Sequence, residues 1–229
     1  MFLKRRALQA EYFDAPDRPL AEMTGDYRRL TQINRLFLLA RSFKKLLPRI
    51  LGEEKCRALS ILDLGAGDCA LGNELSNWAA ARGWDWRITN LDINPRALQL
   101  HGARSVVAGS ALALPFREGV FEVVIASQMT HHFTSEAEAC QHFREAWRVS
   151  KRLLLLNDLH RNLAFYLALG MVLKASGAPA EFFSDGLLSV RKGWRLKEWR
   201  AMAAQAGISD AKVWLYAGTR IMLAARKRA

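Results

Sequence analysis

A turn between a short apolar run and a helical pattern carries the first residues whose types and spacing could do chemistry. In SILDLGAGDCALG, residues 60–72, Asp63 closes the apolar run, Gly65 and Gly67 follow, and Asp68 comes next. Glycines in such a turn let the backbone approach a ligand closely. The turn also fits the loose Gly-x-Gly-x-x-Ala fingerprint of dinucleotide sites, which is weak evidence when it stands alone. The turn therefore predicts a ligand site without identifying the ligand.

The two acids of this turn separate the candidate ligands by charge. A diphosphate bound to the amides that open the following helix would lie between Asp63 and Asp68. Like charges about 4 Å apart repel by roughly 4 kcal/mol at an effective dielectric constant near 20. S-adenosylmethionine carries an amine and a sulfonium and no phosphate, so both carboxylates would attract it. Asp92 ends the next apolar run and can accept from both ribose hydroxyls, as an acid also does in NAD sites.

Apolar runs alternate with helical patterns through the middle of the chain, and this alternation predicts a parallel sheet covered on both faces. The expected strands are residues 60–64, 86–92, 105–109, 120–127 and 152–158, with helices over 70–82, from Asn94-Pro95 onward, and over 135–149. Two further strands, 212–218 and 219–227, are joined at Gly218 and predict an antiparallel hairpin. We expect an α/β fold with a single doubly wound, mostly parallel seven-stranded sheet that ends in this hairpin.

Two segments outside this alternation are expected to cover the site. The chain has 229 residues, 51% of them hydrophobic, which suits one domain with some additional helix. Residues 1–57 are interpreted as a helical, basic lid, and 58–229 as a Rossmann-like domain with a lid insertion at 159–193. The elements expected within the lids are a helix over 33–51 that Pro48 kinks or ends, a helix over 159–175 and a loop over 177–186. Their aromatic residues suit a flat, apolar acceptor, or alternatively form ordinary core.

Three stretches of the sequence, in order and at the right spacing, resemble one enzyme family. ILDLGAGDCALG, NLDINP and VVAGSALALPFREGVFEVVIASQMTHHF look like the class I S-adenosylmethionine-dependent methyltransferases, and within these like the quinone-biosynthesis-like small-molecule group. The resemblance covers about residues 58–158. NDLHRN and DGLLSVRKGW resemble, less specifically, a bacterial subgroup associated with polyketide and phenolic-lipid products of secondary metabolism. The resemblance implies S-adenosylmethionine as cofactor and S-adenosylhomocysteine as product.

The resemblance also implies a role for each matching residue. Around the methionine part, Gly65, Ala66 and Gly67 would pack on the chain of the cofactor and Asp63 would orient its amine. Asp92 would hold the ribose, Ile93 would pack on the adenine, and Ser110 and Ala111 would line the adenine edge. Ser127 and Gln128 would lie beside the transferred methyl group. The family usually carries an acid at position 110. Ser110 departs from that pattern and would accept more weakly from the adenine amine.

A histidine pair after the fourth expected strand and an acid at the end of the fifth are the candidate catalytic residues. His131 and His132 come after the fourth strand, and Asp158 ends the fifth. A histidine oriented by an acid would serve as the base for a phenol or enol oxygen. The alternative is that one histidine packs while the other faces solvent. Oxygen is the favoured target, but transfer to an electron-rich carbon stays open. The cysteines share no metal-ligand spacing, so we expect no metal.

The charge balance favours an anionic partner. There are 34 Lys and Arg residues against 22 Asp and Glu, a net charge of +12, which fits membrane lipid, nucleic acid, an acidic substrate or a solvated surface. Three dispersed cysteines fit a reducing cytosol. The uncharged, mainly apolar stretch of residues 162–173 is shorter than the roughly 20 residues of a membrane span. We expect a small hydrophobic or aromatic substrate and a cytoplasmic protein with peripheral contact to the anionic inner membrane face.

Three alternatives to a small-molecule methyltransferase stay open. An RNA methyltransferase would fit the charge, but the chain lacks a separate RNA-binding module, and IASQMTHHF stands where an Asn-Pro-Pro-aromatic signature would be, so nucleic acid is disfavoured. A non-catalytic, methyltransferase-like binding subunit would fit Ser110. A nicotinamide oxidoreductase is disfavoured by Asp63 and Asp68.

Overall fold

The protein folds around one seven-stranded sheet. The computed structural model describes residues 3–15 and 17–227, so the outermost residues of the predicted ranges 1–57 and 58–229 lie outside it. The strands are β1 (Ala58–Leu64), β2 (Asp85–Asp92), β3 (Val106–Ala108), β4 (Phe121–Ser127), β5 (Ser150–Leu159), β6 (Lys212–Tyr216) and β7 (Arg220–Arg226). Their order across the sheet is β3-β2-β1-β4-β5-β7-β6.

The direction of the strands confirms the predicted fold class. Strands β1 to β5 run parallel, and β7 lies antiparallel to both β5 and β6. The central strands β4 and β5 are buried almost throughout, because helices cover both faces, and this is why they read as continuous apolar runs. The strand order reverses between β1 and β4. In open α/β sheets, the carboxyl ends of the strands at such a reversal form the ligand crevice.

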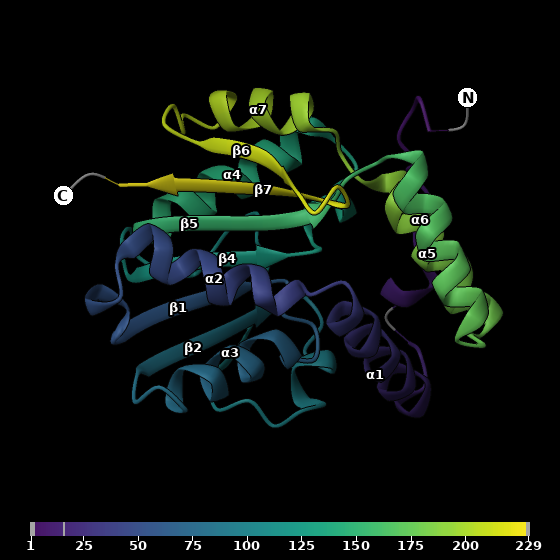
Figure 1. Cartoon of the computed structure of the whole chain (residues 1–229), viewed down its shortest axis with the longest axis horizontal. Helices are drawn as coiled ribbons and strands as arrows, with labels where there is room; N and C mark the ends of the chain where they lie inside the picture. Colours follow the sequence, from purple (N-terminus) through teal and green to yellow (C-terminus); the bar gives the residue numbers. More distant parts are fainter. Residues whose placement is uncertain (1–2, 16, 228–229) are drawn as a thin grey trace.

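Helices cover both faces of the sheet, and further helices lie beyond the strand ends on one side of it (Figure 1). They are α1 (Leu20–Leu36), α2 (Leu39–Leu51), α3 (Ala70–Ala80), α4 (Glu136–Val149), α5 (Leu163–Ala175), α6 (Ala180–Lys192) and α7 (Leu196–Gln205). Phe43 of α2 and Leu75 of α3 belong to the core on one face, and Phe143 of α4 and Trp199 of α7 to the core on the other. Figure 1 shows α1, α5 and α6 beyond the carboxyl ends of the parallel strands. None of the described helices has the length and apolar character needed to cross a bilayer.

The segment 33–51 forms two helices, so the prediction of one helix there is wrong. Leu38 adopts a left-handed conformation, with a φ of 55°, and separates α1 from α2. Pro48 lies inside α2, which continues past it. A proline removes only one N–H, and the complete burial of Phe43 and Leu47 against the sheet stabilises the helix around it.

Two other predicted elements also differ from the structure. Most of the loop expected at 177–186 belongs to α6, because burial of Phe182 against the α5 cluster outweighs the local turn signals. The helix expected from Asn94-Pro95 is a single 3-10 turn, Ala97–Gln99. Asn94 caps this turn as predicted, but Gly102, with a φ of +59°, ends the segment shortly afterwards.

Candidate functional site

A large cavity of about 770 Å³ lies at the carboxyl ends of β1, β2 and β4, and α1, α2 and α6 also contribute lining residues. Every cofactor residue predicted from the sequence lines it: Asp63, Gly65, Ala66, Gly67, Asp92, Ile93, Ser110, Ala111, Ser127 and Gln128. His131 and His132 line the same cavity. Asp158 does not line it, because it is fully buried and hydrogen-bonded to His131. The fold thus brings the cofactor candidates and the histidine pair to one space.

The glycine turn after β1 is held against the end of β2. Gly65 and Gly67 adopt φ values of +65° and +53°, which favour glycine. The Gly67 N–H donates to Oδ2 of Asp92 at 2.8 Å, and the Asn94 N–H donates to Oδ1 of the same carboxylate at 2.8 Å. A Cβ on Gly67 would lie 2.7 Å from Cε1 of Tyr27, a residue of α1. The turn therefore needs glycine both for its backbone and for the close approach of α1.

The two acids of the turn have different surroundings. Burial, and then the nearby charge of Asp92, raises the pKa of Asp63 to about 8. Its Oδ2 has no hydrogen-bond partner within the described parts of the chain. Asp68 has closer polar neighbours: its Oδ1 accepts from the Ala70 N–H at 3.1 Å, and its Oδ2, although it makes no hydrogen bond within the described residues, lies 2.9 Å from Nδ1 of His101. A cationic ligand group beside Asp63 would stabilise the charged form of this carboxylate.

Two histidine–carboxylate pairs lie side by side beyond the turn. Nδ1 of His131 lies 2.7 Å from Oδ1 of Asp158, and the His131 N–H donates to Oδ2 of Asp158 at 2.7 Å. Nδ1 of His132 lies 2.8 Å from Oδ2 of Asp14. The two imidazole rings are 4.2 Å apart between centroids. His131 is almost fully buried, whereas 32% of the His132 side chain is exposed.

The carboxylate of Asp14 tunes the pKa of His132. Burial alone would lower the pKa of this imidazole, but the hydrogen bond to Asp14 and the charges of Glu11 and Asp14 outweigh it, so the pKa is raised. The pKa of Asp14 is lowered: burial would raise it, but the hydrogen bond to His132 and the imidazole charge dominate. Each partner therefore stabilises the charged form of the other.

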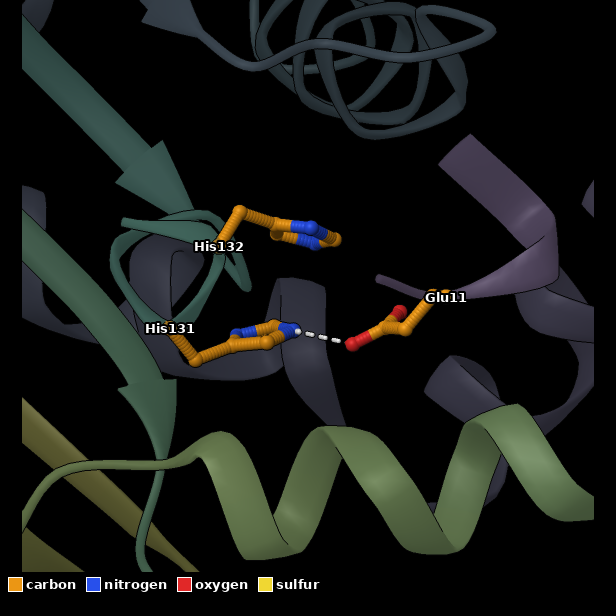
Figure 2. A group of neighbouring side chains, drawn as sticks. All are labelled: Glu11, His131 and His132. Atoms are coloured by element: carbon orange, nitrogen blue, oxygen red, sulfur yellow. Dashed lines mark ion pairs between the residues drawn. The ribbon is translucent and has the colours of Figure 1, made fainter. Parts of the chain in front are cut away.

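A third carboxylate, Glu11, faces the histidine pair (Figure 2). Its Oε1 lies 3.9 Å from Nε2 of His131 and 3.0 Å from Nζ of Lys192, and both side chains are buried. Donor atoms of Glu11, His131 and His132 lie within 4.8 Å of one another, a set that could hold a metal ion. The Lys192 ammonium, however, already balances the charge of Glu11. The absence of a metal therefore stays a prediction, and we interpret the cluster as a charge network around His131.

The segment before α1 supplies Glu11 and Asp14, which the sequence did not reveal as site residues. The position of this segment depends on contacts with α6 and with the residues that follow α6. The Arg6 Nε donates to the Lys192 carbonyl at 2.8 Å, and the Arg6 guanidinium lies 3.4 Å from the centre of the Trp194 ring. The backbone N–H groups of Tyr12 and Phe13 donate to the Asp185 carboxylate. In the sequence, the only local feature that could have pointed to Glu11 and Asp14 is that these two acids flank Tyr12-Phe13 in EYFD.

Comparisons with known proteins identify the domain. Residues 62–153 match a protein-family model described as a methyltransferase domain. A search of curated protein sequences finds no match. Among solved structures, the plantazolicin methyltransferase BpumL in complex with S-adenosylhomocysteine is similar with a TM-score of 0.69 at 12% identity, over 94% of this chain and 92% of that one.

Two further solved structures show the same architecture. Magnesium protoporphyrin IX methyltransferase from Synechocystis, with bound S-adenosylhomocysteine, is similar with a TM-score of 0.60 at 13% identity, over 91% of this chain and 95% of that one. A Nostoc punctiforme protein provisionally named an O-methyltransferase gives a TM-score of 0.65 at 16% identity and 97% coverage of this chain. The present chain spans 64% of the length of that protein.

The domain match and the fold define the class of the protein. Residues 62–153 form a methyltransferase domain, and the whole chain has the fold of methyltransferases whose structures contain S-adenosylhomocysteine. At sequence identities of 12–16%, the similarity to these solved structures is evidence for the fold alone. The acceptor must therefore be inferred from the cavity.

Proposed function

We propose that the enzyme methylates an oxygen of a small, hydrophobic, aromatic acceptor, and that His132 is the general base. The acceptor class is a phenol, a hydroquinone or a polyketide-derived hydroxyl, as in the quinone-biosynthesis-like group of secondary metabolism. The observation that carries the proposal is that a histidine with its own orienting carboxylate lines the same cavity as the acidic glycine turn. A phenol has a pKa near 10, so a base accelerates its reaction at neutral pH.

The chemistry divides between the cofactor and the chain. When bound, S-adenosylmethionine supplies a methyl group on a sulfonium leaving group. Asp63 would bind its amine and Asp92 its ribose, Gly65 to Gly67 would hold the methionine part, and Ile93, Ser110 and Ala111 would surround the adenine. His132 takes the proton from the acceptor oxygen at Nε2 while its Nδ1–H donates to Asp14. An O–H bond and a carbon–sulfur bond break, an O–CH₃ bond forms, and the proton remains on His132.

His132 suits the base role better than His131 does. A base must reach the acceptor proton, and about a third of the His132 side chain is exposed. His131 is buried, its Nδ1 is bound by Asp158, and its Nε2 faces Glu11. We assign His131 and Asp158 the role of positioning the segment that carries His132. Ser127 and Gln128, which precede this segment, would lie beside the transferred methyl group.

The lining of the cavity supports an apolar acceptor. Apolar side chains from three segments line it: Phe13 before α1, Leu30 of α1 and Phe182 of α6. Magnesium protoporphyrin IX, after which one of the structurally similar methyltransferases is named, is likewise aromatic. We retain the division into a lid at 1–57 and an insertion at 159–193 as part of the proposal, together with a cytoplasmic location and contact with the inner membrane face. RNA methylation and a non-catalytic binding role are the competing functions.

Methyl transfer to a panel of alkylated phenols and hydroquinones tests the proposal. With labelled S-adenosylmethionine, we expect the label in an O-methyl ether. His132→Ala should lower kcat by about 10²- to 10⁴-fold, the range for loss of a general base, and added imidazole should restore part of the rate. Cofactor affinity, measured by calorimetry, serves as the control and should not change. Label on a ring carbon would redirect the mechanism to C-methylation, and cofactor binding without turnover of any acceptor would favour a binding subunit.

A further inference from the structure

Three basic residues form an exposed stripe along α2. Arg41, Lys45 and Arg49 recur every four residues, a spacing that places side chains on one face of a helix. All three are exposed, and none makes an ion pair with any residue that the structure describes. Lys44, which points elsewhere on the helix, is bound to Glu74 at 2.6 Å. The stripe is therefore positive charge that the protein does not neutralise.

A second cavity of about 420 Å³ lies beside this stripe, between α2 and α3. Lys45, Arg49, Arg82, Trp78 and Trp84 line it, together with one carboxylate, Glu53, as well as Lys44 and Pro48. The guanidinium of Arg82 lies 4.2 Å from the centre of the Trp78 ring. The Trp78 and Trp84 rings are 5.5 Å apart. Basic groups and half-buried indole rings thus meet in one groove.

The groove lies next to the active-site cavity. Lys44 and Trp78 line both cavities. At the junction of α1 and α2, the active-site cavity is also lined by the exposed side chains of Arg35, Leu38 and Arg41. Leu38 is 48% exposed there, and its neighbour Leu36 is 62% exposed. A ligand held at the groove would lie next to an entrance of the site where methyl transfer takes place.

We infer that this face docks on an anionic phospholipid bilayer, with lipid phosphates in the groove and the leucines in the interface. The residues of the face are Leu36, Leu38, Arg41, Lys45, Arg49, Trp78, Arg82 and Trp84. Clustered Lys and Arg beside indole rings and exposed aliphatic side chains are typical of membrane-interface contact. A nucleic-acid site would have no use for the two exposed leucines. The delivery of an apolar acceptor to the cavity rests on the methylation activity proposed above, whereas docking itself does not depend on that activity.

Co-sedimentation with lipid vesicles tests the inference. We expect the protein to bind vesicles of phosphatidylcholine with phosphatidylglycerol, but not phosphatidylcholine alone, and to be released by salt. Lys45→Gln with Arg49→Gln should weaken binding about 30-fold, because each basic residue near an anionic surface changes partitioning roughly fivefold. Neither residue lines the active-site cavity. The matched control is Lys197→Gln with Lys212→Gln, two exposed lysines of α7 and β6, and it should bind nearly as well as the parent protein.

Two further measurements distinguish membrane docking through this face from nonspecific binding by positive charge, and distinguish docking from catalysis. Leu36→Gln should weaken vesicle binding and leave binding to a single-stranded RNA homopolymer unchanged. Equal losses in the two double variants, no vesicle binding by the parent protein, or RNA binding in place of vesicle binding would each overturn the inference. Methylation of a water-soluble phenol should be the same in the Lys45/Arg49 variant and in the parent. If the parent methylates no phenol yet binds vesicles as expected, the proposed function fails and the docking face stands.

Discussion

The two halves of the active-site cavity are built in different ways. The half that we propose binds the cofactor, called the cofactor half, consists of the ends of neighbouring strands, where the turn after β1 hydrogen-bonds to Asp92 at the end of β2. The half that we propose binds the acceptor, called the acceptor half, joins Asp14 from before α1, His132 from after β4 and Phe182 from α6. The first half depends on backbone geometry within one sheet edge. The second depends on contacts between segments that are far apart in the chain, so we expect it to be more sensitive to remote change.

The largest effect should come from breaking the cofactor half at Asp92. Asp92→Ala removes the acceptor for two backbone N–H groups and for the ribose, and hydrogen bonds to a charged group are each worth about 1.5–3 kcal/mol. We expect S-adenosylmethionine to bind about 100-fold more weakly in calorimetry. Asp85→Ala at the other end of β2 is the control, since the Asp85 side chain is exposed and its carboxylate accepts hydrogen bonds from Arg87. Equal affinity in the two variants would contradict the role of Asp92.

An intermediate effect is expected from the acceptor half at Asp14. The base works when His132 is neutral, so activity rises as pH rises through the pKa of His132. Asp14 raises that pKa, so Asp14→Asn should move the rising limb to lower pH. Loss of the orienting carboxylate should also lower the plateau about tenfold, with cofactor affinity unchanged. The pH profile of kcat measures both effects.

Asp17→Asn provides a matched control in the same segment. Asp17 is exposed and lies three residues after Asp14. Its variant should keep the parent profile. If the pH profile of kcat for Asp14→Asn coincides with that of the parent protein, His132 is not the base, and the role passes to His131.

The smallest effect should come from a methyl group added to the glycine turn. Gly67→Ala imposes a strained φ of +53° and brings Cβ to 2.7 Å from Tyr27, so cofactor affinity should fall about fivefold. Gly83→Ala imposes a similar strain at a φ of +70°, but its Cβ would meet nothing within 4 Å. That variant should lose about 1 kcal/mol of unfolding free energy and no affinity. Denaturant melts and calorimetry on both variants separate strain from contact.

The contrast between the halves also explains what the sequence could predict. The strands and the residues of the cofactor half follow from local patterns, because an apolar run, a glycine turn and the next acid are close in sequence. The break at Leu38 and the helix around Phe182 depend on burial between distant elements. Asp14 and Glu11 gain their importance only from contacts with His132 and His131, and no short-range pattern encodes these contacts.

The hydrogen bond from the Tyr12 N–H to the Asp185 carboxylate has a consequence for biosynthesis. The two residues are 173 positions apart, so the ribosome makes the segment that carries Asp14 long before its anchor in α6 exists. The cofactor half of the cavity can form once β4 has left the ribosome. Asp14 is not held in place to orient His132 until α6 has also been made. Competence for methyl transfer is therefore acquired late in translation.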